Sequence, residues 1–212
     1  MTLDVFADIA CPWCYIGEAH LDAALAERPD LAVERRWRPF QLQPGLPPEG
    51  LPREPFFTDK FGGAGPMRAA FAHVTEAGAR AGLAFDFDRL SGAPNTADAH
   101  RTVLLAQAQG LGAEVARALF RAYFSEGRDV GDAAVLDEVA RSVGVEGAAE
   151  MLASERLRAE VAAGQLEAQR LGVTGVPFVV LGGRLAVSGA QPPEAFAEAI
   201  RQAEALAEAG AA

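Results

Sequence analysis

The spacing of apolar residues changes along the chain, and this change limits the fold more than any other feature. Apolar residues alternate near both ends, as in β-strands, and recur every three or four positions in the middle, as in α-helices. The beginning of the chain predicts a strand from Thr2 to Asp8, a helix from Cys14 to Glu27 and a strand from Leu31 to Arg38. The end predicts two strands, Phe178 to Leu181 and Arg184 to Val187. This pattern indicates the α/β class.

The C-terminal segment carries two further local signals. Gly182 and Gly183 form a two-residue hairpin signal between the last two strands. Pro192 and Pro193 predict the start of a final helix. The residues of this helix that we expect to face the core are Phe196, Ala199, Ile200 and Ala203. The order of elements is therefore βαβ, several helices, and ββα.

A proline-rich passage from Pro39 to Pro55 separates the first strands from the helices. Its six prolines predict irregular structure and a boundary. Beyond it, helical spacing predicts helices that include Met67 to Val74, Leu111 to Tyr123, and Val135 to Val143. The middle of the chain is therefore expected to be helical.

Composition and charge exclude several classes of partner. Half of the 212 residues are apolar, which is enough for a core without disulfide staples. The net charge is -10 and Lys60 is the only lysine among 19 basic residues, so we expect no binding to nucleic acid. No apolar run approaches the length of a membrane span, and no signal peptide precedes the first strand. We therefore expect a cytoplasmic protein that does not contact a membrane.

The only two cysteines, Cys11 and Cys14, enclose Pro12 and Trp13 at the start of the first predicted helix. In a cytoplasmic protein such a pair is more often catalytic or metal-binding than structural. With Cys11 at the N-cap and Pro12 in the first helical position, backbone N–H groups of Trp13 and Cys14 face the Cys11 sulfur. These groups and the helix dipole favour a thiolate. Cys11 is therefore the predicted nucleophile.

The spacing of the two cysteines suits a disulfide that forms and breaks. Residues three positions apart on a helix lie about 5 to 6 Å from each other, within the range that a disulfide tolerates. Closing this four-residue loop stabilises a fold by roughly 2 kcal/mol, against about 3 kcal/mol for a fifteen-residue loop. Such a bond is better suited to exchange than to stabilisation, so Cys14 is the predicted resolving thiol that attacks a mixed disulfide on Cys11.

Two other interpretations of the pair remain open. A zinc site needs about four ligands, and the chain offers two cysteines, three histidines and scattered carboxylates without a second pair at short spacing. We therefore expect no metal. The remaining interpretation is that the two cysteines have no chemical role.

Four segments together resemble the DsbA family of thioredoxin-fold oxidoreductases, and within it the FrnE-like subfamily. They are "CPWCYIG" from Cys11, "WRPFQLQP" from Trp37, "PNTADAHR" from Pro94 and "GVTGVPFVVLGGRLAVSGAQP" from Gly172. The resemblance implies a thioredoxin-like fold interrupted by an α-helical domain, in agreement with the change of spacing. The expected extents are residues 1–44 and 160–212 for the thioredoxin-like domain and 45–159 for the inserted helical domain.

The resemblance also implies a substrate-binding surface around the dithiol. It implies that the Val176–Pro177 peptide bond is cis and faces the cysteines. Val176 would then offer its backbone N–H and C=O groups to an extended substrate. Pro12 and Trp13 would flank the nucleophile, with Trp13 making apolar contacts to substrate.

Asp8 is a further candidate because it lies three residues before Cys11. It could accept the proton of Cys14, as a buried acid near the dithiol does in thioredoxin-like proteins. The alternative is that Asp8 ends the strand and caps the loop that follows, because charged groups near reactive sites also occur for structural reasons.

The segment from Asn95 to Arg101 predicts the start of a helix. Asn95 suits the N-cap, and Asp98 suits the first turn because a carboxylate there complements the helix dipole. The family resemblance makes Asn95, Asp98, His100 and Arg101 candidates for lining a cleft that faces the dithiol and binds a small polar ligand such as glutathione.

We therefore expect a thiol–disulfide oxidoreductase or protein disulfide isomerase that needs no cofactor beyond its own Cys11–Cys14 disulfide. Its partners would be protein or peptide thiols and disulfides, or small thiols such as glutathione as co-substrate. The sequence leaves open whether the protein forms a homodimer. One alternative is a glutathione-dependent enzyme of the 2-hydroxychromene-2-carboxylate isomerase or kappa glutathione transferase type, against which the intact cysteine pair counts. Another is a redox sensor or a chaperone-like binding module.

Overall fold

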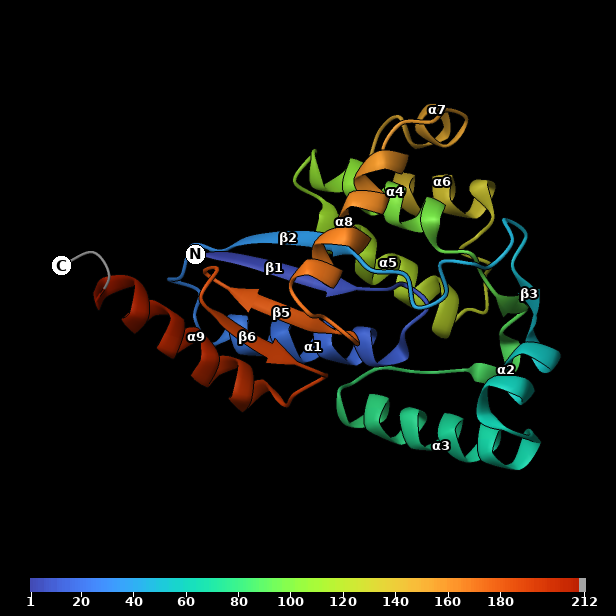
Figure 1. The fold of residues 1–212 in the computed structure, drawn as a ribbon, viewed down its shortest axis with the longest axis horizontal. Helices are drawn as coiled ribbons and strands as arrows, with labels where there is room; N and C mark the ends of the chain where they lie inside the picture. The colour runs from blue at the N-terminus through green and yellow to red at the C-terminus, as the bar shows by residue number, and fades with distance from the viewer. Residues whose placement is uncertain (210–212) are drawn as a thin grey trace.

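A computed structural model describes residues 1–209 as a mixed α/β fold (Figure 1). The strands are β1 (Thr2–Ala7), β2 (Glu34–Pro39), β3 (Leu51–Pro52), β4 (Gly92–Ala93), β5 (Phe178–Leu181) and β6 (Leu185–Ser188). The helices are α1 (Pro12–Ala26), α2 (Arg53–Phe61), α3 (Ala64–Arg80), α4 (Ala97–Gln107), α5 (Gly112–Phe124), α6 (Ala133–Ser142), α7 (Ala148–Leu152), α8 (Arg158–Arg170) and α9 (Pro193–Ala209). A short 3-10 turn spans Phe87–Arg89.

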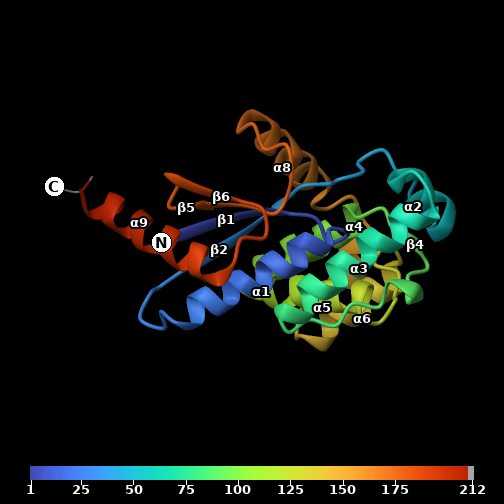
Figure 2. The same ribbon diagram turned by 90° about the horizontal axis from the view of Figure 1, so that it is seen from below.

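The main sheet brings the two ends of the chain together in the strand order β2-β1-β5-β6. The strand β1 runs parallel to β2 and antiparallel to β5, and β5 forms a hairpin with β6. Helices α1 and α9 cover one face of this sheet and α8 covers the other (Figure 2). Both faces of β1 are buried, including Val5 and Phe6, because helices lie on each side. The predicted α/β class and the βαβ and ββα ends are confirmed.

The helices between β2 and α8 pack against the same hydrophobic core as the sheet. On α1, the Tyr15 ring stacks on Phe120 of α5 with ring centres 5.2 Å apart. On β2, Trp37 lies 6.2 Å from the same Phe120 ring. One cluster of buried side chains therefore runs from β1 and α1 into α5 and α6, so the helical segment is fixed against the sheet.

The C-terminal hairpin and final helix are confirmed, with one shift at the turn. Gly182 and Gly183 have φ values of 58° and 69°, the left-handed geometry of a tight hairpin turn. Because Leu181 pairs with Leu185, Arg184 also belongs to the turn, and β6 begins at Leu185 rather than at Arg184. The final helix α9 begins at Pro193, as its sequence predicts. The buried residues of α9 are the four expected ones, Phe196, Ala199, Ile200 and Ala203.

Two other boundary predictions are wrong. The strand β2 begins at Glu34 rather than at Leu31, because the Leu31 amide donates to the Arg28 carbonyl in a turn. The proline-rich passage is not wholly irregular, since it contains β3 and the start of α2. Pro52 lies in a two-residue edge strand, and Pro55 lies in the first turn of α2, where a missing N–H leaves no helical bond unmade.

Within residues 1–209, none of the helices combines the length and the apolar character needed to cross a membrane.

Candidate active site

The cysteine pair lies at the junction of β1 and α1. Cys11 is the N-cap residue of α1, with an extended backbone, and Pro12 is the first helical residue, as predicted. The Cys14 amide donates to the Cys11 carbonyl at 3.0 Å, which closes the first turn. Both cysteines are free thiols. Cys11 is 4% exposed and Cys14 is fully buried, so a visiting molecule can reach only Cys11.

Cys11 lines a cleft of about 360 Å³ between the start of α1 and the helices α2 and α3. One wall comes from residues 10–13 and from Gly175 and Val176. The opposite wall comes from α2, α3, the 3-10 turn and the end of α5, with Phe57, Phe71 and Phe124 among its side chains. The nucleophile candidate therefore faces a mainly apolar, aromatic surface supplied by the helical segment.

Val176 and Pro177 lie beside the cysteine pair. The peptide bond between them is cis, and the Cys11 sulfur lies 3.6 Å from the Val176 carbonyl oxygen. Gly17 of α1 packs against the Pro177 ring, where a Cβ atom on Gly17 would lie 2.8 Å from Pro177 Cγ. Because only glycine fits at this position without displacing the ring, α1 sets the position of Pro177 as well as that of the cysteines.

The electrostatics of the two sulfurs differ. Burial raises the pKa of Cys14 well above its ordinary value, and the adjacent Cys11 raises it further through a hydrogen bond and through its negative charge. Cys14 therefore remains a thiol at neutral pH. When the Cys11 sulfur enters a disulfide, the contribution of Cys11 to the raised pKa of Cys14 disappears.

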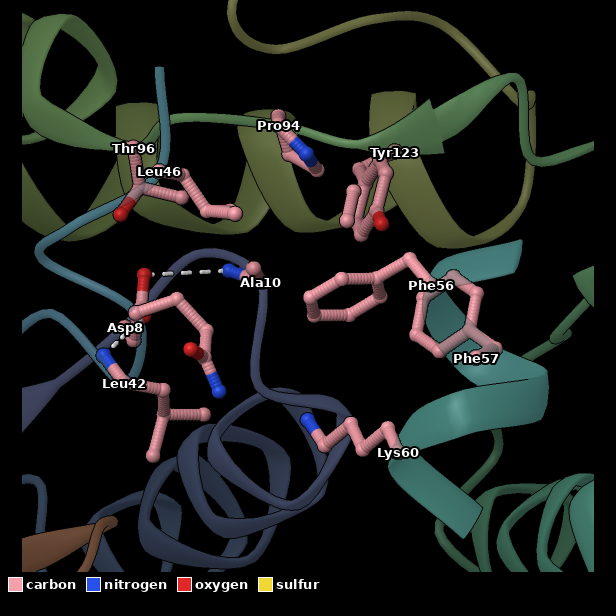
Figure 3. Close-up of a pocket in the computed structure, with 12 residues that line it drawn as sticks. Asp8, Ala10, Leu42, Leu46, Phe56, Phe57, Lys60, Pro94, Thr96 and Tyr123 are labelled. Atoms are coloured by element: carbon pink, nitrogen blue, oxygen red, sulfur yellow. Dashed lines mark hydrogen bonds between the residues drawn. The ribbon is translucent and has the colours of Figure 1, made fainter. Parts of the chain in front are cut away.

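Asp8 holds the loops around the dithiol. Its side chain is buried, and its carboxylate accepts hydrogen bonds from the Ala10 amide at 3.2 Å and the Leu42 amide at 2.7 Å (Figure 3). Burial alone would raise the pKa of Asp8, but His100 and the Leu42 amide lower it, and the net pKa lies below its ordinary value. Asp8 is therefore a buried carboxylate at neutral pH, with the loop-capping contacts that a strand-end residue makes.

A buried chain of polar groups connects Asp8 to β2. The indole Nε1 of Trp37 donates to His100 Nδ1 at 3.0 Å. Because this ring nitrogen accepts, the hydrogen of the neutral ring lies on Nε2. His100 Nε2 faces Asp8 Oδ1 at 3.4 Å, which is longer than a well-formed hydrogen bond and makes the contact mainly electrostatic. His100 is thus a fully buried neighbour of Asp8.

None of the four residues expected from the resemblance to line the cleft does so. Asn95 donates to the Leu46 carbonyl and accepts from the Ala97 amide, while the N-cap of α4 is Thr96 rather than Asn95. Asp98 accepts from Arg101, whose guanidinium is fully buried. That guanidinium also donates to the carbonyls of Met151, Ser154 and Arg156. Asn95, Asp98 and Arg101 therefore fix α4 and the turn after α7, and His100 lies behind the dithiol loop.

The residues of α2 that line the cleft were missed by the sequence analysis. A second, smaller cavity of about 20 Å³ lies between Asp8 and α2 (Figure 3), and it shares Ala10, Leu42, Phe57, Lys60 and Tyr123 with the main cleft. Two hints exist in the sequence: Lys60 is the only lysine, and it lies in the aromatic run "PFFTDKF". Neither feature predicts that this segment faces Cys11, because that position depends on how α2 packs against the rest of the fold.

Comparison with known proteins supports the same fold. A family model described as a DSBA-like thioredoxin domain matches residues 2–201. A probable DsbA oxidoreductase from Streptomyces coelicolor is 35% identical, with a TM-score of 0.88, over 97% of this chain and 90% of that chain. The cytosolic disulfide reductase DsbM from Pseudomonas aeruginosa is 28% identical, with a TM-score of 0.69, over 97% of this chain and 100% of that chain. An uncharacterized protein of Bacillus subtilis is 26% identical over 93% of this chain and 94% of its own length.

A second structure of the Pseudomonas protein was solved with GSH. It is 27% identical to this chain, with a TM-score of 0.65, and covers 99% of this chain and 98% of that chain. The matches extend over almost the whole of this chain, so they include the helices between β2 and α8 as well as the sheet.

Proposed function

Since this chain belongs to the family of DSBA-like thioredoxin domains, we propose that it is a thiol–disulfide oxidoreductase in which Cys11 attacks and Cys14 resolves. The observation that carries the proposal is the position of the two sulfurs. Cys11 lines a cleft at the N-terminus of α1, while Cys14 is fully buried behind it. This arrangement supports Cys11 as the sulfur that reacts with a substrate and Cys14 as the sulfur that reacts with Cys11.

The reaction proceeds in two exchanges. The Cys11 thiolate attacks one sulfur of a substrate disulfide, the substrate S–S bond breaks, and the other substrate sulfur leaves as a thiolate that takes a proton. Cys14 then loses its proton and attacks Cys11, which releases the second substrate thiol. The protein dithiol is oxidised by two electrons and the substrate disulfide is reduced by two. The same steps in reverse oxidise a dithiol.

The remaining parts of the proposal concern the subtype and the partners. We assign the chain to the FrnE-like subtype, with disulfide isomerase activity, in the cytoplasm. Val176 and Pro177 would contact the substrate together with Pro12 and Trp13. The GSH in the structure of the Pseudomonas disulfide reductase supports a small thiol as a partner of this chain.

The proposal is tested by measuring turnover with a thiol reductant and two disulfides, insulin and oxidised glutathione. We expect catalysed reduction of at least one, and recovery of scrambled ribonuclease if the protein is also an isomerase. Absence of turnover with both disulfides would contradict the proposal. Activity confined to a glutathione-dependent isomerisation would support the alternative enzyme class instead.

Asp8 is the proposed proton acceptor for Cys14 in the second exchange, since its carboxylate is ionised and buried near the pair. Asp8→Asn is expected to slow resolution of the mixed disulfide at neutral pH by about 10²-fold, the lower end for a positioned acid or base. The deficit should shrink as the pH rises toward the raised pKa of Cys14, because solvent bases then remove the proton. Single-turnover release of the second thiol across a pH series measures this.

A faster rather than slower Asp8→Asn protein would contradict the proposed role of Asp8. The Asp8 charge also raises the pKa of Cys14, so a carboxylate that acts only through its charge would make Asp8→Asn faster rather than slower. Asp4→Asn is the matched control, because Asp4 lies on β1, the strand that Asp8 directly follows, and pairs with Arg38. Its resolution rate should equal that of the parent.

A further inference from the structure

We propose that the cleft beside Cys11 selects small disulfides that combine an aromatic or similarly apolar body with an anionic group, and that Lys60 binds the anionic group. The inference rests on the proposed function and names the substrate class of that site. It stands on three observations: the enclosure of Cys11, the apolar walls of the cleft, and the single cation among the residues that line it.

The enclosure of Cys11 limits the size of the substrate that can reach it. Cys11 is 4% exposed and its accessible side faces the cleft, so a disulfide must enter the cleft before attack. The volume of about 360 Å³ lies at the lower end of the range of about 300 to 1,000 Å³ that is typical of small-molecule sites. The space therefore suits a small disulfide with one half seated inside.

The walls favour an apolar and flat body. Trp13 of α1, Phe57 of α2 and Phe71 of α3 line the cleft from three different elements. Phe57 and Phe71 meet edge to face with ring centres 5.3 Å apart, and Phe71 also stacks on Phe87 at 4.3 Å, so this wall is a continuous aromatic cluster. Burying an aromatic group here replaces its contact with water by contact with these rings, which is favourable in proportion to the area covered.

The charge of the lining favours an anion. Among the described residues that line the cleft, Lys60 is the only one with a permanent charge, and no aspartate or glutamate is present. Figure 3 shows the Lys60 ammonium pointing from α2 into the smaller cavity beside the cleft. Among the residues that the structure describes, the only acidic one that lines this cavity is Asp8, whose carboxylate already accepts from two backbone amides. The Lys60 ammonium lies over the Phe56 ring, 5.7 Å from the ring centre, and Phe56 lines that smaller cavity. In a chain of net charge -10, this local cation gives an anionic ligand one favourable place to bind.

The chemistry at the site is the exchange described above. The Cys11 thiolate attacks the substrate sulfur that is seated in the cleft, and the outer half leaves as a thiolate with the electrons of the broken S–S bond. Attack by Cys14 on Cys11 then releases the inner half. The protein ends as the Cys11–Cys14 disulfide, and the substrate ends as two thiols.

Single-turnover rate constants of the reduced protein test the proposal with two aromatic disulfides. Dithiobis(nitrobenzoate) carries carboxylates and dithiodipyridine is uncharged. Lys60→Gln should lower the rate constant with the anionic reagent by about threefold to fivefold, the effect of losing a partly exposed ion pair. It should leave the rate constant with dithiodipyridine unchanged. Lys60→Arg should retain the parent rate constant with both reagents.

Arg68→Gln is the matched control for the charge. Arg68 is exposed on α3, lines a different groove, and its loss changes the net charge by the same amount. Arg68→Gln should leave both rate constants unchanged. The charge assignment is overturned if Lys60→Gln has no effect, if it slows both reagents equally, or if Arg68→Gln slows the anionic reagent as much.

The apolar part is tested by a third reagent, the uncharged aliphatic disulfide of mercaptoethanol. Relative to a free cysteine peptide, the protein should prefer dithiodipyridine over this reagent by about tenfold, because burial of the ring contributes to binding. Equal preference would overturn the apolar part. If the parent protein releases no thiol from any of the three disulfides, the proposed function itself fails, which is a different outcome from a loss of selectivity.

Discussion

Replacing Cys11 with serine is expected to slow disulfide exchange by at least about 10³-fold, because a neutral hydroxyl replaces the only sulfur that faces the cleft. Cys14 cannot take over the attack, since it is fully buried and its pKa is raised well above the ordinary value. The rate of thiol release from a small disulfide measures the effect. A Cys11→Ser protein that exchanges at the parent rate would contradict the assignment of the nucleophile.

Cys14→Ser is the matched partner of this experiment. It keeps the nucleophile and removes the resolving thiol, so the first exchange should proceed and the reaction should stop at a mixed disulfide on Cys11. Intact mass measurement after one turnover should show one substrate half attached to the protein. Release of both substrate halves by the Cys14→Ser protein would show that Cys14 is not needed for resolution.

Arg101→Met is expected to lower the free energy of unfolding by about 3 kcal/mol, because it leaves buried carbonyl groups without donors. The Arg101 guanidinium is fully buried and binds the carbonyls of Met151, Ser154 and Arg156. It joins α4 to the turn that leads into α8. Urea unfolding at neutral pH measures the loss.

The control for Arg101 is Arg141→Met, which removes an exposed arginine that pairs with Asp137 on the same helix. Its effect should be below about 0.5 kcal/mol, as for other exposed pairs. An Arg101→Met protein as stable as the parent would contradict the structural role assigned to Arg101.

Local patterns were sufficient to predict much of the fold. The hairpin at Gly182 and Gly183 depends on backbone geometry that glycine alone adopts freely, so two residues define it. The buried face of α9 follows from the helical period of its apolar residues. The position of Cys11 at the start of α1 follows from Pro12, which favours the first helical position.

The cleft was not predictable in the same way, because it forms between distant segments. The contact between Trp37 and His100 joins residues 63 positions apart, and no local pattern links them. Phe57 and Phe71 face Cys11 only because α2 and α3 fold back over the dithiol. The polar residues Asn95 and Arg101 satisfy nearby backbone groups instead, which the residue types alone do not distinguish from binding a ligand.

A redox titration tests the proposed exchange of Cys11 with Cys14 most directly. The parent protein is equilibrated in buffers of defined thiol–disulfide ratio, quenched with acid and digested. The mass of the peptide that contains both cysteines is then measured. We predict one reversible transition in which this peptide loses two hydrogens, because an internal disulfide forms. The fraction oxidised should depend on the buffer potential with the slope of a two-electron couple. A peptide that remains a dithiol throughout, or that accumulates only mixed disulfides, would contradict the proposal.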